Sequence, residues 1–411
     1  MSIIGQALKS YRMEQGFTQE QLADGICSVA YLSKLENGKI SVDQTVVMNL
    51  CDRLELDQTP FLIKTDTVFH DELLQWLSDI HIFHILEVDK RTPSIFETKR
   101  DAMSIDNQCL YDIALLGYYL MTDQLQNAAT QCDELEKRPL LYQACDPFSF
   151  FKFTGMYYRR KGLYHNAIER LEQANDSYHE QEDAELYITM ATVYSRLNNI
   201  LISNKYAQLA FSIFQEKLFY VRMIDCQIVL GVNYSLVGDV YSAETYFQQL
   251  LEVDGEHLLD KTRANIHHNI GYINFRKKEY HDAKQSFERA LTFNVNESDF
   301  LNARYLLAYI AMQERDRFKA KEHIQTGLIV ANRYEHLRYK IKFRVLDYLL
   351  DEQTDKLVDY LEDEVLSFFE TNREEIELKS YYYLLGQLMF DQKKYKRAAE
   401  CFKRSTDGLV V

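Results

Sequence analysis

Apolar residues at helical spacing predict a compact set of short helices over residues 3–56. The first helix carries its apolar face on Ile4, Ala7, Leu8 and Tyr11. Gly16 ends this helix, and the run from Thr18 to Gln21 has the pattern of a capping box, because the Thr18 hydroxyl can accept from the Gln21 amide while the Gln21 side chain reaches back. A second short helix, with Leu22 facing inward, is therefore expected to begin here.

Two further helices complete this N-terminal pattern. Ser28 is placed to cap a helix whose Leu32 and Leu35 face the core, and Asn37-Gly38 is a typical C-terminal exit. A last helix is expected over 44–54. The four segments together predict a small helical bundle.

The rest of the chain repeats one pattern, in which a small residue is followed twelve positions later by another. The pairs are Gly117 and Ala129, Gly155 and Ala167, Ala191 and Ser203, Gly231 and Ala243, Gly271 and Ala283, Ala308 and Ala320, and Gly386 and Ala398. Two antiparallel helices can cross closely only where both have small residues. With one degenerate unit near residues 335–372, the pattern predicts about eight helical hairpins in series.

The clearest copies are GMYYRRKGLYHNAIERLEQA (155–174) and GYINFRKKEYHDAKQSFERA (271–290). Their small and aromatic positions resemble the tetratricopeptide repeat, although these units are slightly longer than the usual 34 residues. The resemblance implies an all-α chain in which the N-terminal bundle precedes a right-handed superhelical solenoid. The first helix of each hairpin would line the concave face, where such solenoids commonly bind extended peptides.

Residues 58–105 connect the two patterns. The region begins with a helix stop and linker at 57–60, and an amphipathic helix is expected from His70 to Val88. This helix is more apolar than a solvated linker requires, so it should pack on the first hairpin or on a partner subunit. His81 and His84 are three residues apart, but without nearby cysteines or a second matched pair they favour interfacial histidines over a metal site.

Composition narrows the class of protein. The 411 residues include only 4 prolines and 14 glycines, which favours helices, and the seven scattered cysteines form no CxxC motif. The sequence shows neither a secretory signal nor an apolar run long enough to span a membrane, which predicts a reduced, cytoplasmic protein. No nucleotide-binding or hydrolase motif is present, so we expect no enzymatic activity and no cofactor or metal.

The order Thr18-Gln19, Leu22-Ala23, 31–35 and Glu36-Asn37-Gly38 resembles the Cro/repressor (XRE) helix-turn-helix, with a turn shortened as in the PlcR-type subgroup. This resemblance places the second helix of the motif in the major groove of operator DNA. The DNA-binding residues that it implies are Gln19, Ser28, Val29, Ala30, Tyr31, Ser33 and Lys34.

The charge of this N-terminal segment sets a limit on how it binds DNA. The whole chain has a net charge of −15, and residues 1–57 hold five basic and eight acidic side chains, a net charge of −3. Affinity from phosphate neutralisation is then modest. A homodimer is expected, because two half-sites double the contacts and supply spacing specificity.

Asparagines on the first helices of the repeats are the candidate peptide-binding residues, because an amide both donates and accepts and can pair with a peptide backbone. Asn265 and Asn269 are four residues apart on the first helix of the fifth unit, and Asn233 lies in the corresponding helix of the fourth. Each is alternatively an ordinary surface or interhelix residue. The weaker candidates are His268, Gln227, Arg222 and Arg263, the arginines for a peptide carboxylate.

A helix-turn-helix followed by long tetratricopeptide-like units resembles the RRNPP family of Gram-positive peptide-pheromone receptors, in particular its NprR- and PlcR-like members. Membership implies a DNA-binding domain at 1–57, linker helices at 58–105 and a repeat domain at 106–411 that binds peptide and mediates dimerisation. It also implies a quorum-sensing regulator whose operator binding is controlled by a short signalling peptide.

Two alternatives stay open within this resemblance. The first is a protein-binding solenoid or phosphatase acting on a response regulator, for which Gln75 is the only glutamine in the linker helix. The second is a peptide receptor of the kind that controls phage lysis and lysogeny.

Overall fold

The computed structural model describes residues 3–177, 182–254, 259–293, 297–372 and 374–406. Over these residues the chain is all-α, without a strand, which confirms the predicted fold class; the handedness of the repeats stays a prediction. The helices separate into two compact units, one ending at Leu197 and the other beginning at Asn198. In the part of the chain described, no helix is long and apolar enough to cross a membrane.

The head, which we define as residues 3–62, contains the helices expected from the sequence. They are α1 (Ile4–Glu14), α2 (Gln19–Ala23), α3 (Val29–Glu36) and α4 (Gln44–Arg53), followed by a short α5 (Thr59–Leu62). The predicted capping box is confirmed, since Thr18 Oγ1 accepts from Gln21 N at 3.1 Å and Gln21 Oε1 accepts from Thr18 N at 2.8 Å. Pro60 does not end a helix as expected but lies in the first turn of α5.

The linker region differs from the single helix predicted over 70–88. It forms two helices, α6 (Thr67–His81) and α7 (Ile85–Glu97), followed by a 3₁₀ turn at Arg100–Ala102. The break falls at Phe83, whose φ of 55° no helix accommodates. Leu73, Trp76 and Ile80 of α6 are buried, and α6 packs on α8 (Ile105–Met121), as expected for the first hairpin.

A buried polar network fastens α6 to the second hairpin. Lys152 is fully buried and donates to Asp183 Oδ2 at 2.7 Å and to His81 Nδ1 at 3.1 Å. His81 Nε2 lies 2.8 Å from Ser149 Oγ, so both ring nitrogens contact protein groups. Burial and the Lys152 charge lower the pKa of His81 to about 3. His81 is thus a neutral interfacial histidine, the reading that the sequence favoured over a metal ligand.

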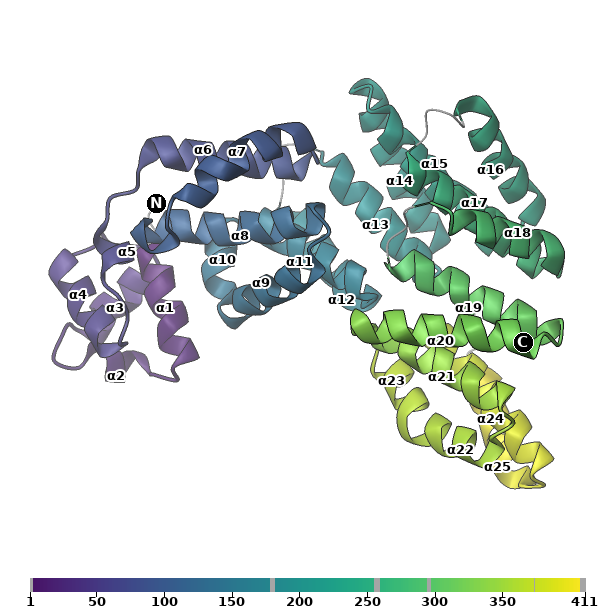
Figure 1. Ribbon diagram of the computed structural model, residues 1–411. Helices are drawn as coiled ribbons and strands as arrows, with labels where there is room; N and C mark the ends of the chain where they lie inside the picture. The colour runs from purple at the N-terminus through teal and green to yellow at the C-terminus, as the bar shows by residue number, and fades with distance from the viewer. Residues whose placement is uncertain (1–2, 178–181, 255–258, 294–296, 373, 407–411) are drawn as a thin grey trace. The chain divides into compact units, whose positions relative to one another are not determined.

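Helices in antiparallel pairs make up the rest of each unit (Figure 1). The first unit continues with α9 (Leu125–Lys137), α10 (Pro139–Cys145), α11 (Pro147–Lys161), α12 (Tyr164–Ser177) and α13 (Ala184–Arg196). The second unit begins with α14 (Ile200–Glu216), α15 (Tyr220–Leu236), α16 (Val240–Asp254), α17 (Asp260–Arg276), α18 (Tyr280–Ala290), α19 (Glu297–Gln313) and α20 (Arg317–Arg333).

The small residues do mark close crossings. A Cβ added to Gly155 would lie 3.2 Å from Ala167 O, and one added to Gly271 would lie 3.2 Å from Ala283 O, so these predicted pairs meet. Gly117 differs, because its nearest atoms belong to Phe153 of α11 and Ile80 of α6 rather than to α9. The twelve-residue spacing therefore reports packing within a hairpin in some units and between neighbouring hairpins in another.

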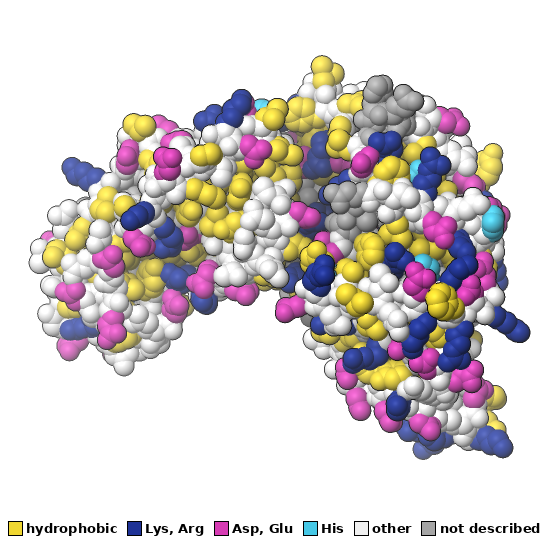
Figure 2. Space-filling model, in the orientation of Figure 1, with side chains coloured by type: hydrophobic (Ala, Val, Ile, Leu, Met, Phe, Trp, Pro, Cys, Tyr) yellow, Lys and Arg dark blue, Asp and Glu magenta, His cyan; other side chains and the backbone are white. Residues whose placement is uncertain are grey.

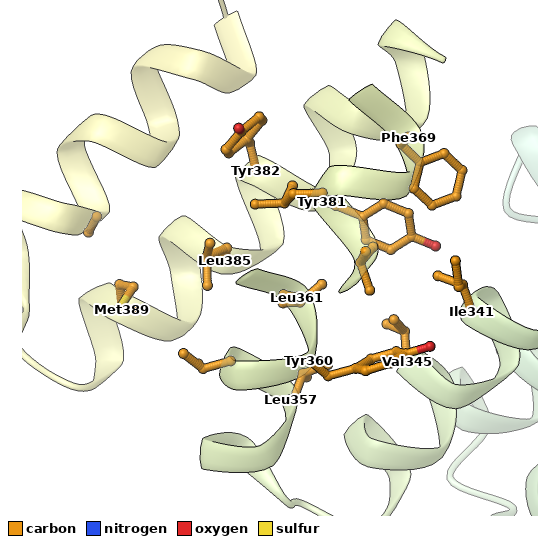
Figure 3. Close-up of a cluster of buried hydrophobic side chains, with 14 residues drawn as sticks. Ile341, Val345, Leu357, Tyr360, Leu361, Phe369, Tyr381, Tyr382, Leu385 and Met389 are labelled. Carbon is orange, nitrogen blue, oxygen red and sulfur yellow. The ribbon is translucent and has the colours of Figure 1, made fainter. Parts of the chain in front are cut away.

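The degenerate unit expected near 335–372 is a hairpin with an irregular second arm. It comprises α21 (Leu337–Leu350), α22 (Thr354–Tyr360), a π-helical turn (Leu361–Val365) and α23 (Leu366–Thr371), and it precedes α24 (Glu375–Asp391) and α25 (Tyr395–Thr406). Figure 3 shows its apolar side chains converging on α24, with Leu361, Phe369 and Leu385 fully or almost fully buried. The π turn keeps the apolar face of this arm directed at the core despite the missing small-residue pair.

The tightest contact in the head provides a test of its packing. A Cβ on Gly5 would lie 1.9 Å from the backbone oxygen of Leu35, where α1 crosses α3. We predict that Gly5→Ala lowers the free energy of unfolding of the head by about 1–3 kcal/mol, because a backbone carbonyl cannot rotate away. Chemical denaturation measures this change. Met13→Ala, on the exposed face of α1, is the matched control and should change stability by less than about 0.5 kcal/mol.

Candidate functional sites: the recognition helix and the asparagine row

Helix α3 presents one exposed face, and most of the predicted DNA-binding residues lie on it. Ser28, Val29, Ala30 and Lys34 are exposed, whereas Tyr31 and Ser33 are half-buried. Ser28 Oγ accepts from Tyr31 N at 3.1 Å and so caps the helix, as predicted. The opposite face carries Leu32 and Leu35 into the core, which fixes the direction of the exposed one.

Gln19, a predicted DNA-binding residue, also makes a hydrogen bond within the head. Its amide nitrogen donates to Glu36 Oε2 at 2.7 Å, and Arg12 binds the same buried carboxylate through Nε at 2.6 Å. Arg12 also donates to Phe17 O. Glu36 therefore joins α1 and the start of α2 to the end of α3. The Gln19 amide keeps one hydrogen with which to donate to a DNA phosphate.

Internal contacts also occupy a second basic residue of the head. Arg53 donates to the backbone oxygens of Leu22 and Asp24, so it caps the end of α2 rather than facing solvent freely. Acidic and basic side chains are interspersed on the face of the head that Figure 2 shows. The exposed Lys34 is thus the cation placed on the recognition face itself.

Of the predicted peptide-binding residues, those of α17 lie together. Asn269 Nδ2 donates to Asn265 Oδ1 at 3.0 Å and to Asn265 O at 2.9 Å. His268 Nε2 lies 3.0 Å from Asn302 Nδ2, which belongs to α19. We call Asn265, Asn269 and Asn302 the asparagine row. It spans the first helices of two consecutive hairpins.

Sequence reasoning missed Asn302, although a signal was present. Asn302 lies six residues before Ala308, as Asn265 lies six residues before Gly271. The two residues therefore occupy equivalent positions of successive units, and Tyr305 is likewise equivalent to His268. Aligning the units on their small residues would have found both.

For Asn233 the structure favours the alternative of an interhelix residue over that of a peptide clamp. Its side chain is 1% exposed, and Nδ2 donates to Ser203 Oγ at 2.8 Å and to Asn204 Oδ1 at 2.7 Å. Asn233 therefore holds α15 to α14, because it lies on the face of α15 that meets the preceding helix. We leave it out of the proposed site.

The remaining candidates are only partly available. Arg222 pairs with Asp225 at 2.6 Å, and Arg263 pairs with Asp260 at 2.8 Å, each one turn along its own helix. Gln227 is half-buried on α15. The guanidinium of Arg263 also lies 5.3 Å from the centre of the Phe293 ring. A peptide carboxylate would have to compete with Asp260 for Arg263.

Comparison with known proteins agrees with both parts of the chain. A helix-turn-helix family model matches residues 8–57, and a tetratricopeptide-repeat model matches 264–294 and 380–407. The chain is 27% identical over 409 residues to the transcriptional activator NprA of Geobacillus stearothermophilus, covering 93% of this chain and 98% of that protein. In its helix-turn-helix head and its repeats, the chain is similar to the RRNPP family of peptide receptors.

Other relatives of the chain match it over a smaller part of its length. Response regulator aspartate phosphatase I of Bacillus subtilis (strain 168) is 27% identical over 304 residues, which is 70% of this chain and 76% of that protein. The structure of NprR with its cognate peptide NprX aligns with a TM-score of 0.71 at 18% identity, over 82% of this chain and 98% of that one. A Rap protein complexed with competence and sporulation factor aligns at 0.67 and 20% identity, over 82% and 96%. Both structural matches show a shared fold.

Proposed function

We propose that this protein is a quorum-sensing transcription regulator, in which α3 reads operator DNA and a short signalling peptide bound along the repeats controls that reading. The observation that carries the proposal is the presence, in one chain, of an exposed recognition face and an accessible asparagine row. An extended peptide presents alternating N–H and C=O groups, and asparagine amides can pair with both.

The relatives support both halves of this proposal. The protein that is similar over nearly the whole chain, head included, is a transcriptional activator. Two structures that share the fold contain a bound partner: NprR holds its cognate peptide NprX, and a Rap protein holds competence and sporulation factor. The control itself requires that the peptide bind two states of the repeats with different affinity, because a ligand that binds both equally shifts nothing.

We propose further that the protein acts as a homodimer through the repeat domain at 106–411. A head with a net charge of −3 gains affinity and spacing specificity from a second copy. The last hairpin exposes Tyr383, Phe390 and Tyr395, and Tyr383, Phe390 and Phe402 line a shallow hollow there. An apolar surface of this kind at the end of a repeat array fits a second copy of the same hairpin.

The alternative function, dephosphorylation of a response regulator, has less support. The phosphatase-type relative matches 70% of the chain, whereas the transcriptional activator matches 93%. Gln75, the residue that would orient a water, is exposed on α6, and its amide lies 3.4 Å from Asp79 Oδ1. A phage-type peptide receptor would share the proposed DNA and peptide sites and differ only in its target genes.

The test of the whole proposal is selection of genomic fragments by the purified full-length protein, at a stated salt concentration, with and without a short-peptide extract of the same culture. We expect a two-fold-symmetric site whose occupancy changes with the extract. If the occupancy of the selected site does not change with the extract, the proposed peptide control is wrong. If no fragment is enriched under either condition, the proposed DNA binding is wrong.

For DNA binding, we predict that Lys34→Glu weakens binding to the selected fragment at least tenfold, because a carboxylate replaces the cation on the recognition face. Lys278→Glu makes the same charge change on an exposed residue of the repeats and should leave affinity within twofold. Electrophoretic mobility shift at fixed salt measures both. Equal affinity of Lys34→Glu and the unchanged protein would contradict this docking of α3.

For peptide control, we predict that Asn269→Ala makes the change in fragment occupancy caused by the extract about tenfold smaller. Fragment occupancy in the absence of extract should stay the same as in the unchanged protein. The loss of one amide pairing to a peptide backbone accounts for a change of this size. Asn332→Ala, on the exposed surface of α20, is the control and should respond like the unchanged protein. Undiminished response of Asn269→Ala would remove the asparagine row from the peptide site.

For assembly, we predict that Phe390→Glu converts the dimer into a monomer at micromolar concentration, because it places a charge in the apolar surface of the last hairpin. Light scattering after size exclusion measures the mass. Phe318→Glu, at a side chain 81% exposed on α20, is the matched control and should remain dimeric. A dimer that persists in Phe390→Glu would locate the interface elsewhere.

A further inference from the structure

Helix α1 of the head lies directly against the first repeat. It packs on α10 and contacts α8, both in the same compact unit as the head. α10 is an extra short helix inserted between the first and second hairpins, and Arg138 immediately precedes it. The head therefore meets α8 of the first hairpin and also an insertion that the repeat pattern itself does not require; α5 likewise contacts α8 and the 3₁₀ turn at Arg100–Ala102.

Arg138 makes the principal contact across this boundary. Its Nη1 donates to the Tyr11 hydroxyl at 2.5 Å, and its guanidinium carbon lies 4.6 Å from the centre of the Tyr11 ring. Its Nε lies 3.3 Å from Glu14 Oε2. The Arg138 side chain is only 15% exposed, so water screens these interactions less than those of a surface pair. Burial raises the pKa of Tyr11, which keeps the hydroxyl protonated.

A second contact holds the other end of α1. The backbone nitrogen of Ile3 donates to Asp106 Oδ1, at the start of α8, at 3.2 Å. Ile3 and Tyr11 are about 12 Å apart along a helix at 1.5 Å per residue. Two attachment points at this separation fix the direction of α1 as well as its position.

The repeat side of the contact is itself braced. Asp112 of α8 binds Arg100 through both carboxylate oxygens, at 2.8 and 2.6 Å, and accepts from the Tyr142 hydroxyl of α10 at 3.0 Å. α10 is thereby held to α8. Meanwhile the recognition face of α3 remains exposed, so the docked head is free to read DNA.

We propose that Arg138 clamps the head to the first repeat, so that the repeat domain, rather than the head, sets the spacing of the two operator half-sites. This proposal rests on the proposed function for its DNA-binding consequence. Two heads held rigidly on a dimer can meet half-sites at one separation only. Heads released from the clamp would swing on the segment between α4 and α6 and accept several separations. Arg138 is thus a positioning residue for operator recognition.

The clamp is tested first without DNA or peptide. Lys64 is exposed in the segment that joins α5 to α6, and trypsin cleavage there releases the head. In Arg138→Ala we expect cleavage at Lys64 to be at least tenfold faster, with the circular dichroism of the folded chain unchanged. Arg170→Ala is the matched control, because Arg170 also binds a carboxylate and lies over aromatic rings, but wholly within the repeats. Its cleavage rate should match that of the unchanged protein.

The second arm measures half-site spacing on duplexes selected from a random library by the full-length protein. Arg138→Ala should bind a single half-site as well as the unchanged protein does. It should also lose about tenfold in affinity for the selected two-half-site duplex and bind duplexes with two base pairs added or removed equally well. Tyr11→Phe, which keeps the ring but loses the hydroxyl, should fall between the two.

The outcomes separate the clamp from the DNA-binding function. A retained spacing preference in Arg138→Ala, or unchanged cleavage at Lys64, overturns the clamp. If the unchanged protein selects no duplex while Arg138→Ala is cleaved faster, the clamp stands and the proposed DNA function falls.

Discussion

Close approach of helix backbones is the constraint on which the rest of this structure depends. Where Gly155 faces Ala167 and Gly271 faces Ala283, an added Cβ would come within 3.2 Å of a backbone oxygen. Crossings this tight allow the large side chains to fill the space between hairpins, so that within a unit each hairpin can stack on the next in a similar way. Equivalent residues of successive first helices then lie next to one another. His268 of α17 accordingly lies beside α19, where it contacts Asn302, the equivalent of Asn265.

Local features of the sequence predicted much of the fold, because the physics that determines them is local. Caps such as Thr18 and Ser28 lie three residues from the amides that they bind, and the small residues that meet, such as Gly155 and Ala167, are twelve residues apart. The break at Phe83 was not predictable in this way, since neither glycine nor proline marks it. Phe83 takes a positive φ just past the end of α6, where His84 N donates to Asp79 O and closes the last turn.

The candidate sites divide along the same line. The exposed face of α3 follows from helical periodicity, and so does the pairing of Asn265 with Asn269. The burial of Asn233 against Ser203 does not, because it depends on which side of α15 meets α14. The contact of Arg138 with Tyr11 could not be predicted from local sequence either, because the two residues are 127 positions apart and only the fold brings them together. Contacts between the head and the repeats are thus the part that single-sequence reasoning could not reach.

The shortage of cations on the head has a consequence for how the protein finds its sites. Arg12 and Arg53 are bound internally, and the head as a whole is acidic. Few condensed counterions are released on contact with arbitrary DNA, so the hold on non-target sequence is weak. Such a protein spends little time sliding along the chromosome and reaches its sites by repeated three-dimensional encounters. Only a small fraction of the protein is then bound to non-target DNA, so that even a small number of copies remains available to the target sites.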